Sequence, residues 1–389
     1  MQNLGDLGAD VIKIERPVQG DDTRHWGPPW MGNAASPSAR ESAPFLSVNR
    51  NKRSVAIDLA VPDGQRLVRR LAERCDVVIE NYKVGALARY GLDYPSIRAV
   101  RANVIYLSLT AYGQDGPYAD RPGYDYIFQG LGGLMSVTGE RDDRPGGGPQ
   151  RCGVPLVDLF TGMYATVAIL AALNHRLATG EGQHIDLSLF DTALALSSPQ
   201  LSNYMLSGKV PGRLGNASPN IAPYGVFPAS DGELIIAGAN QSQWVSLCAA
   251  IGAPALADDP RFATNAARLA HYDAMHEALS QRLRTRTSVQ WEAILTEVGV
   301  PAGPINNYAK ALSHPQAVHR GARIDLQHSQ GEAAPGVASP MRFSETPVEY
   351  RLPPPQLGEH TFEVLREQLA LDDETLLQFA GAGVIAGRR

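Results

Sequence analysis

One acidic side chain interrupts an otherwise apolar stretch near the middle of the chain. Asp158 lies within residues 153–165, which read GVPLVDLFTGMYA. From Leu159 to Leu173 apolar side chains recur at helical spacing, and Arg176 and Gly180 follow as helix-ending residues. The sequence therefore predicts a mostly apolar, buried helix whose N-terminus is marked by Asp158.

The carboxylate of Asp158 allows two interpretations. As an N-cap it would accept a hydrogen bond from a free N–H group of the first turn, a role worth about 1 kcal/mol. As a nucleophile it would attack an activated acyl group, which requires the ionised form. A helix N-terminus favours an ionised carboxylate, so the two roles are compatible. Spacing alone favours the cap and does not decide between them.

Composition narrows the class of protein. The chain has 389 residues, 44% of them hydrophobic and 19% charged, so two globular domains are expected. A net charge of −5 gives no indication of nucleic-acid binding. No apolar run approaches the ~20 residues of a membrane span. The three cysteines lack CxxC spacing and the nine histidines lack metal-site spacing. We expect a cytoplasmic protein with no membrane segment and no metal ion.

Strand and helix patterns alternate in the first half of the chain. Strands are expected at residues 9–15, 54–59, 76–80, 103–108 and 184–189, with helical stretches between them. This alternation favours a doubly wound α/β domain with a parallel sheet. No G-x-G-x-x-G follows a strand and no G-x-x-x-x-G-K-[ST] occurs, so the usual nucleotide-binding motifs are absent.

The second half predicts a smaller unit. After a Gly- and Pro-rich linker, a strand is expected at 232–238 and helices at 242–251, 265–284 and 288–298, with a closing helical region at 360–379. The predicted domains are therefore a large one at 1–210, a linker at 211–224, a small one at 225–311, and a linker with a return to the large domain at 312–389.

Eight motifs in order carry a family resemblance over nearly the whole chain. They are LGADVIKIERP, GDDTR, NRNKRS, VIENY, GALARYG, PGYDY, GVPLVDLFTGMYA and GVPAGPINN. The chain resembles the family III CoA-transferases, also called the CaiB/BaiF family. The resemblance implies a Rossmann-like large domain formed by both chain ends, a smaller α+β domain, and a homodimer of interlocked rings. It also implies a first strand before LGADVIKIE, which is missing in front of Met1.

The resemblance assigns chemistry to named residues. Asp158 would attack an acyl-CoA to give a mixed anhydride and then an aspartyl-CoA thioester, with CoA as substrate and no tightly bound cofactor. A loop would shield the intermediates and offer N–H groups to the oxyanion. Cationic and polar side chains would bind CoA. The loop is Ala237, Gly238, Ala239 and Asn240, and the CoA-binding residues are Arg24, Lys52, Arg53, Asn81, Tyr82, Arg89 and Tyr124.

Further stretches resemble the succinyl-CoA:glutarate (dicarboxylate) CoA-transferases of this family. They are GDDTRHWGPP, SVNRNK, GPINN and PPPQLGEHT, and they imply succinyl-CoA as donor and a short dicarboxylic acid as acceptor. Two alternatives remain. A racemase of α-methylacyl-CoA would need a His before Asp125, where the chain has Tyr124, whose reference pKa of about 10 suits a base poorly. An inactive CoA-binding protein would result from loss of the first strand.

Overall fold

The computed structural model describes residues 1–32 and 40–388. The chain forms two compact units. Unit 1 comprises Met1–Gly132, Pro155–Leu196 and Leu312–Arg389, and unit 2 comprises Gly133–Val154 and Ser197–Ala311. Both chain ends therefore belong to unit 1. Residues 133–154 and 197–210, which the sequence assigns to the large domain, belong instead to unit 2.

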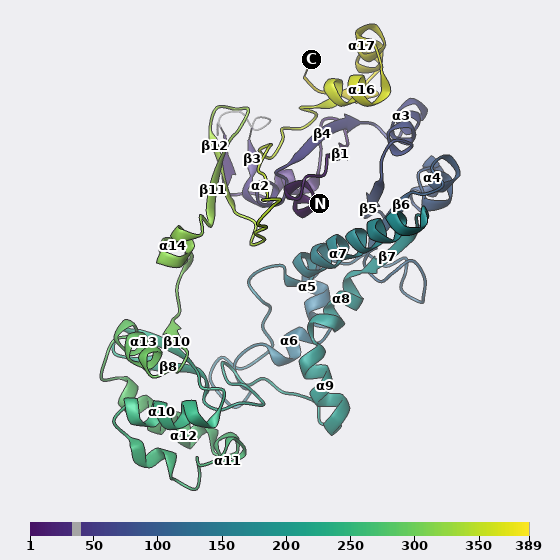
Figure 1. Ribbon diagram of the computed structural model, residues 1–389. Coiled ribbons are helices and arrows are strands. Elements are labelled where there is room, and N and C mark those ends of the chain that lie inside the picture. Colours follow the sequence, from purple (N-terminus) through teal and green to yellow (C-terminus); the bar gives the residue numbers. More distant parts are fainter. Residues whose placement is uncertain (33–39, 389) are drawn as a thin grey trace. The chain divides into compact units, whose positions relative to one another are not determined.

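Unit 1 mixes helices with short strands (Figure 1). Its strands are β1 (Val11–Glu15), β2 (Trp30–Met31), β3 (Glu41–Ser42), β4 (Lys52–Ile57), β5 (Val77–Glu80), β6 (Ile105–Thr110), β7 (His184–Ser188), β11 (Arg323–Gln327), β12 (Ala333–Val337) and β13 (Ile385–Ala386). Its helices are α1 (Gln2–Asp6), α2 (Ala43–Val48), α3 (Pro62–Ala72), α4 (Tyr94–Val100), α5 (Asp125–Leu131), α7 (Leu156–Thr179), α8 (Leu189–Leu196), α15 (Pro315–His319), α16 (Thr361–Leu369) and α17 (Asp373–Gly381), with short 3₁₀ turns at Asp22–His25 and Ala88–Tyr90.

The parallel strands of unit 1 form two three-stranded sheets. In one sheet β4 lies between β1, its parallel neighbour, and β13, its antiparallel neighbour. In the other sheet β6 lies between β5 and β7, and all three strands are parallel. The sequence predicts one doubly wound sheet. Among the described residues, however, β1 pairs only with β4 and β5 pairs only with β6, and the strand expected before Met1 stays a prediction.

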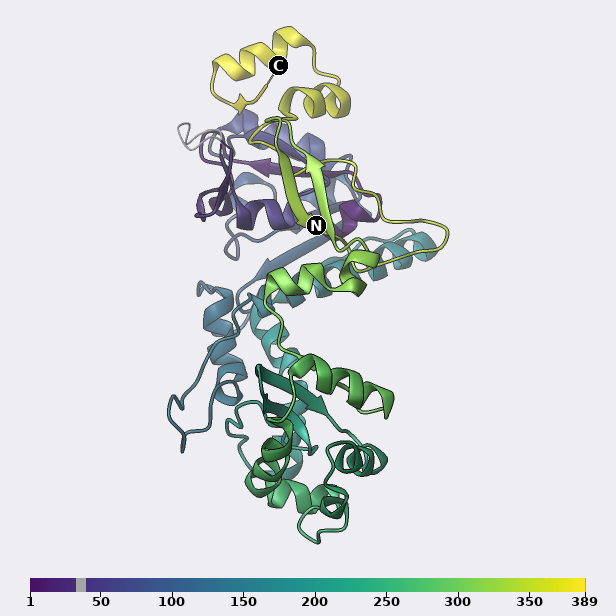
Figure 2. The same ribbon diagram turned by 90° about the vertical axis from the view of Figure 1, so that its left-hand side faces the viewer.

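The C-terminal helices complete the core around β4, whose six residues are all buried. Val55 and Ile57 of this strand pack with Leu67 of α3 and with Phe362 and Leu365 of α16. Figures 1 and 2 show α16 and α17 beside the N-terminal strands. Each such fully buried side chain contributes roughly 1.5–3 kcal/mol. The last segment of the chain therefore stabilises the sheet formed by the first.

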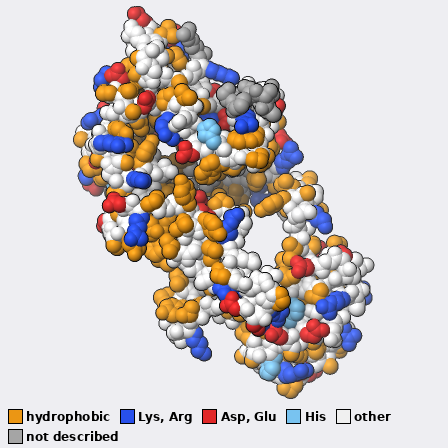
Figure 3. Space-filling model, turned by 180° about the vertical axis from the view of Figure 1, so that it is seen from behind, with side chains coloured by type: hydrophobic (Ala, Val, Ile, Leu, Met, Phe, Trp, Pro, Cys, Tyr) orange, Lys and Arg blue, Asp and Glu red, His pale blue; other side chains and the backbone are white. Residues whose placement is uncertain are grey.

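Helix α7 spans 24 residues, and one side of it covers the β5–β6–β7 sheet. Ala165 and Ile169 pack against Leu107 of β6 and Leu4 of α1. The opposite side is not buried: Leu159, Phe160, Met163, Tyr164, Val167 and Leu170 are 44–60% exposed. The prediction of a buried helix is therefore wrong for the side of α7 that carries these residues. Hydrophobic side chains also gather in surface patches on the face drawn in Figure 3.

Unit 2 packs helices against a three-stranded antiparallel sheet of order β10–β9–β8. Trp244, Phe227, Leu234 and Trp291 lie in its core. Its elements are α6 (Leu134–Val137), α9 (Ser198–Ser207), β8 (Tyr224–Ala229), β9 (Gly232–Ala237), α10 (Gln241–Ala250), the 3₁₀ turn Pro254–Ala257, α11 (Asn265–Ala270), α12 (Tyr272–Leu283), α13 (Ser288–Glu297) and β10 (Ala302–Pro304), and α14 (Tyr308–Ser313) leads out of it.

Candidate active site

Asp158 lies in the first turn of α7, which begins two residues earlier at Leu156. Its side chain is exposed. Within the described residues no group donates a hydrogen bond to its carboxylate, and α7 has no side-chain cap from its own N-cap residue, Pro155. Asp158 is therefore not the N-cap that helix spacing predicts. Its oxygens are free to react with a molecule that reaches the helix end.

The carboxylate that caps α7 comes from α5. One oxygen of Asp125 accepts hydrogen bonds from the backbone N–H of Val157 at 2.8 Å and of Asp158 at 3.3 Å. Its other oxygen accepts from the side-chain amide of Gln129 at 2.6 Å. The sequence places Asp125 in the PGYDY motif, but nothing in local spacing indicates that it caps a helix 31 residues further along the chain.

The surroundings of Asp158 disfavour its charged form. Although the side chain is exposed, desolvation by the protein around it raises its pKa, and the negative charge of Asp125 raises it further, to about 6. At neutral pH the carboxylate is therefore still mostly ionised. It carries the charge that nucleophilic attack requires, and none of the described residues donates a hydrogen bond that would stabilise this charge.

If only the ionised carboxylate attacks, the rate of the CoA transfer that the resemblance implies should fall as the pH drops through about 6. An aspartate with an ordinary pKa would remain ionised down to about pH 4. The measurement is kcat/KM for the acyl-CoA substrate between about pH 4 and about pH 8, with circular dichroism at each pH to show that the protein stays folded. A fall of kcat/KM centred at about pH 4 would contradict the raised pKa of Asp158.

Four of the predicted CoA-binding residues have exposed side chains in unit 1. Asn81 and Tyr82 directly follow the carboxyl end of β5, and both are exposed. Arg89 is exposed on a 3₁₀ turn, with its guanidinium 4.5 Å from the centre of the Tyr90 ring. Tyr124 precedes α5 and is 68% exposed. These side chains are accessible to a ligand.

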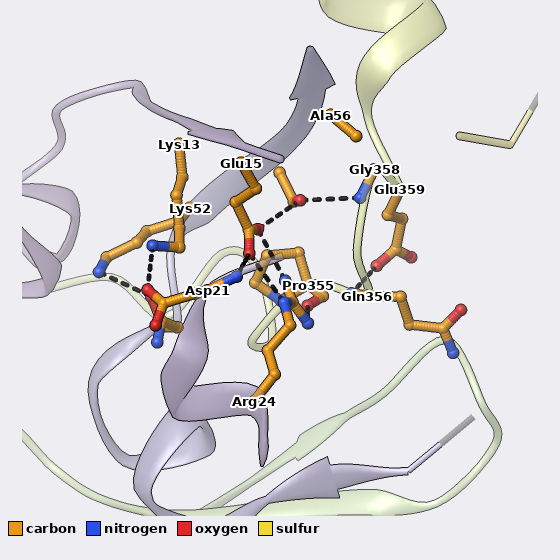
Figure 4. Close-up of polar contacts among 12 residues, drawn as sticks. Lys13, Glu15, Asp21, Arg24, Lys52, Ala56, Pro355, Gln356, Gly358 and Glu359 are labelled. Atoms are coloured by element: carbon orange, nitrogen blue, oxygen red, sulfur yellow. Dashed lines mark hydrogen bonds and ion pairs between the residues drawn. The ribbon is translucent and has the colours of Figure 1, made fainter. Parts of the chain in front are cut away.

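Arg24 lies inside the protein (Figure 4). Its guanidinium donates to both oxygens of Glu15 at 2.8 Å, to Glu41 at 2.8 Å and to the carbonyl of Pro355 at 3.1 Å. The same group lies 3.8 Å from the centre of the Phe45 ring. Arg24 therefore joins β1, β3 and the C-terminal segment, and its contact with CoA stays a prediction.

Lys52 and Arg53 are also buried and paired within unit 1. The ammonium group of Lys52 donates to Asn49 at 2.9 Å, and desolvation lowers its pKa to about 7. The guanidinium of Arg53 forms ion pairs with Asp10, Glu363 and Glu367. Both cations are thus already bonded to polar side chains around β4. Their binding of CoA stays a prediction.

The predicted shielding loop connects β9 to α10 in unit 2. Three of its four backbone N–H groups already donate hydrogen bonds: Ala237 to the carbonyl of Pro301, Gly238 to that of Pro223, and Ala239 to the side chain of Gln243. The side-chain oxygen of Asn240 caps α10 by accepting from the N–H of Gln243 at 2.9 Å. In this conformation the first three N–H groups are not available to an oxyanion, so such a role would require the loop to rearrange.

The described residues contain no group of three or more His, Cys, Asp or Glu side chains that could hold a metal ion. Two cavities of about 360 and 320 Å³ lie in the C-terminal part of unit 1, and no predicted site residue lines either of them. The reactive group that the geometry offers is the Asp158 carboxylate in the first turn of α7.

Comparison with known proteins gives consistent results. Residues 1–361 match the sequence model described as CoA-transferase family III. The chain is 48% identical over 371 residues to a succinate–glutarate CoA-transferase from Agrobacterium fabrum, covering 94% of this chain and 90% of that protein. It is 39% identical to a human succinyl-CoA:glutarate CoA-transferase, covering 98% and 85%.

The fold matches as well. A CaiB/BaiF family protein from Brucella suis superposes with a TM-score of 0.83 at 46% sequence identity, with 94% of each chain covered. The mixed α/β fold is thus that of known CaiB/BaiF structures. Family model, relatives and fold agree with the family that the eight motifs indicate. The chain belongs to CoA-transferase family III.

Proposed function

We propose that this CoA-transferase moves CoA from succinyl-CoA to a short dicarboxylic acid such as glutarate, through an aspartyl-CoA thioester on Asp158. The observation that carries the mechanism is the exposed Asp158 carboxylate, which accepts no hydrogen bond from the described residues because Asp125 caps the helix in its place. The choice of substrates is supported by the relative from A. fabrum, which is 48% identical and acts on succinate and glutarate by name.

The proposed reaction has two symmetrical halves. An oxygen of Asp158 attacks the thioester carbon of succinyl-CoA, the C–S bond breaks, and a mixed anhydride and CoA thiolate form. The thiolate then attacks the Asp158 carbonyl carbon and releases succinate, which leaves the aspartyl-CoA thioester. Glutarate reverses these steps and restores the carboxylate. Each step exchanges one activated acyl group for another, so no external energy source is consumed.

The exposed polar side chains of unit 1 are the proposed CoA contacts. Arg89 supplies a guanidinium suited to phosphate, while Asn81, Tyr82 and Tyr124 supply hydrogen bonds and apolar surface. The loop at residues 237–240 is proposed to shield the intermediates. CoA enters as part of the substrate, and no tightly bound cofactor is needed.

Two residues argue against racemisation: Asp125, whose carboxylate accepts three hydrogen bonds, and its neighbour Tyr124. Tyr124 occupies the position at which a racemase would carry a histidine base, and Asp125 is occupied by two backbone N–H groups and an amide. Neither side chain is arranged to remove an α-proton near neutral pH.

The substrates are tested by mixing the purified protein with succinyl-CoA and glutarate and following glutaryl-CoA by mass spectrometry. The proposal predicts formation of glutaryl-CoA and loss of succinyl-CoA in equal amounts. Transfer to oxalate or another acid, with none to glutarate, would show a different acceptor. Transfer from another acyl-CoA but not from succinyl-CoA would show a different donor.

We also propose a cytoplasmic homodimer in which a second protomer covers the exposed side of α7. Contrary to the expectation that no apolar run is long enough, this helix could cross a membrane by length and composition, but the core helix of a soluble protein passes the same test. Only 33% of its most apolar stretch is buried within one chain. Contiguous exposed apolar surface of this kind marks interaction sites.

Val167→Asp should therefore weaken the dimer, because it places a charge in the middle of the proposed interface. Val167 is 60% exposed in the single chain, so the change should not disturb the core. Val289→Asp is the matched control, because Val289 is 62% exposed on a helix of unit 2. The molar mass from light scattering should fall to that of a monomer for Val167→Asp only. A dimer mass for both variants would exclude α7 from the interface.

A further inference from the structure

Asp125 occupies an unusual position for an acid. Its side chain is only 8% exposed, and its charge acts on a second acid, Asp158. Three groups donate to its carboxylate: the N–H of Val157, the N–H of Asp158 and the side-chain amide of Gln129. Asp125 and Gln129 lie one turn apart on α5, so α5 presents a prearranged acceptor to the start of α7. All of these residues belong to unit 1.

The free N–H groups at the start of a helix attract any nearby carboxylate. Asp158, in the first turn of α7, is itself a candidate to bond them. Because Asp125 already accepts from Val157 and Asp158, those donors are taken. Among residues 1–32 and 40–388, the carboxylate of Asp158 is therefore left without a hydrogen-bond donor, although a carboxylate in such a position commonly has one.

We infer that Asp125 is a positioning residue for the transfer reaction: by capping α7 from another helix, it keeps the Asp158 carboxylate free for attack on the acyl-CoA. This inference rests on the proposed function of Asp158. It assigns no contact between Asp125 and the substrate. Asp125 acts through the backbone and through its charge.

The charge of Asp125 has a separate effect on Asp158. The elements packed against α7 carry several titratable groups. Of these groups, only Asp125 contributes its charge to the raised pKa of Asp158. The groups are Asp6 on α1, Glu80 on β5, Asp125 and Tyr126 on α5, Asp191 on α8, Tyr106 on β6, and His184 and Asp186 on β7. Removal of this one charge should lower the pKa of Asp158.

Two variants separate the cap from the charge. Asp125→Asn keeps an oxygen that can accept from the Val157 N–H but removes the charge, so the acid limb of the pH profile should move from about 6 toward the ordinary aspartate range. Asp125→Ala removes both, so Asp158 is expected to turn back and bond its own helix end. For this variant kcat should fall by at least about fivefold, the factor that corresponds to one capping hydrogen bond.

The measurements are kcat, KM for succinyl-CoA and the pH profile of both variants, with Asp191→Asn on the neighbouring helix as control and with thermal unfolding recorded for each. KM should stay near the wild-type value, because Asp125 does not touch the substrate. If Asp125→Ala does not fold, Asp125→Ser takes its place, because its shorter side chain also removes the charge and withdraws the capping oxygen from the Val157 N–H. If both Asp125 variants show the wild-type kcat and pH profile while Asp158→Ala is inactive, the inference about Asp125 is wrong but the proposed function of Asp158 stands. Full activity of Asp158→Ala would overturn the proposed function as well.

Discussion

Asp158→Ala is expected to lower the rate of CoA transfer by at least about a thousandfold, because removal of a covalent nucleophile leaves only binding and orientation. The fold should survive the change. The side chain is exposed, accepts no hydrogen bond within the described residues, and does not cap its helix. Its loss should therefore leave the thermal unfolding temperature close to that of the wild type.

Asp158→Asn is a stricter version of the same experiment, since the amide has the same shape but is a poor nucleophile. Both variants should bind CoA with nearly unchanged affinity, which separates loss of chemistry from loss of binding. The control is Asp191→Ala, an exposed acid on α8. Transfer at even a tenth of the wild-type rate by folded Asp158→Ala would show that another group forms the covalent bond, or that none is formed.

Arg24→Met is expected to lower the free energy of unfolding by about 3–5 kcal/mol, because it leaves buried carboxylates without their cation. Arg24 bonds both oxygens of Glu15 and one of Glu41, whose side chains are 1% and 7% exposed. Glu41 is already unfavourably placed: burial raises its pKa to about 7, and its second oxygen has no partner within the described residues. Without Arg24 both acids would have to be protonated or solvated.

The matched control is Arg16→Met, which removes an arginine whose ion pair with Asp22 is exposed. Exposed pairs of this kind contribute about 0–1 kcal/mol. Urea unfolding followed by circular dichroism measures both variants. The same midpoint for the two would show that the Glu15–Arg24–Glu41 cluster does not hold the first sheet to the C-terminal segment. An increase of KM in folded Arg24→Met would support the contact with CoA that remains a prediction.

The position of the nucleophile could be predicted from sequence, but its environment could not. The GVPLVDLFTGMYA stretch identifies Asp158 and a long apolar helix, since both depend on neighbouring residues. The cap on that helix comes from Asp125 on α5, and tertiary contacts of this kind leave no local pattern. For the same reason the burial of Arg24 could not be predicted, because its partners, Glu15, Glu41 and Pro355, come from separate segments.

Strands were easier to predict than their arrangement. Periodicity locates β1, β4, β5, β6 and β7 to within a few residues, but it does not state which edges pair, and the observed split into two sheets was not predicted. The closing helical region is two helices, because Ala370 adopts a left-handed conformation (φ 52°) and Asp372 caps α17 through the N–H of Thr375. Helical periodicity continues across such a break, so the pattern alone does not reveal it.

The exposed side of α7 illustrates a limit of hydrophobic patterning. An apolar surface around the whole helix predicts burial on all sides. It does not tell whether the covering surface comes from the same chain or from another one. In the single chain Val167 and its neighbours are exposed, and the proposed second protomer accounts for both the pattern and the exposure.

The covalent role of Asp158 is tested most directly by isotope exchange in the absence of an acceptor. The protein is incubated with succinyl-CoA and isotopically labelled succinate, and the label in succinyl-CoA is followed by mass spectrometry. An aspartyl-CoA intermediate predicts that label enters succinyl-CoA in the wild type and that exchange is lost in Asp158→Asn. Absence of exchange in a preparation that makes glutaryl-CoA from glutarate would contradict it, because CoA would then pass between the two acids without ever being held by the protein.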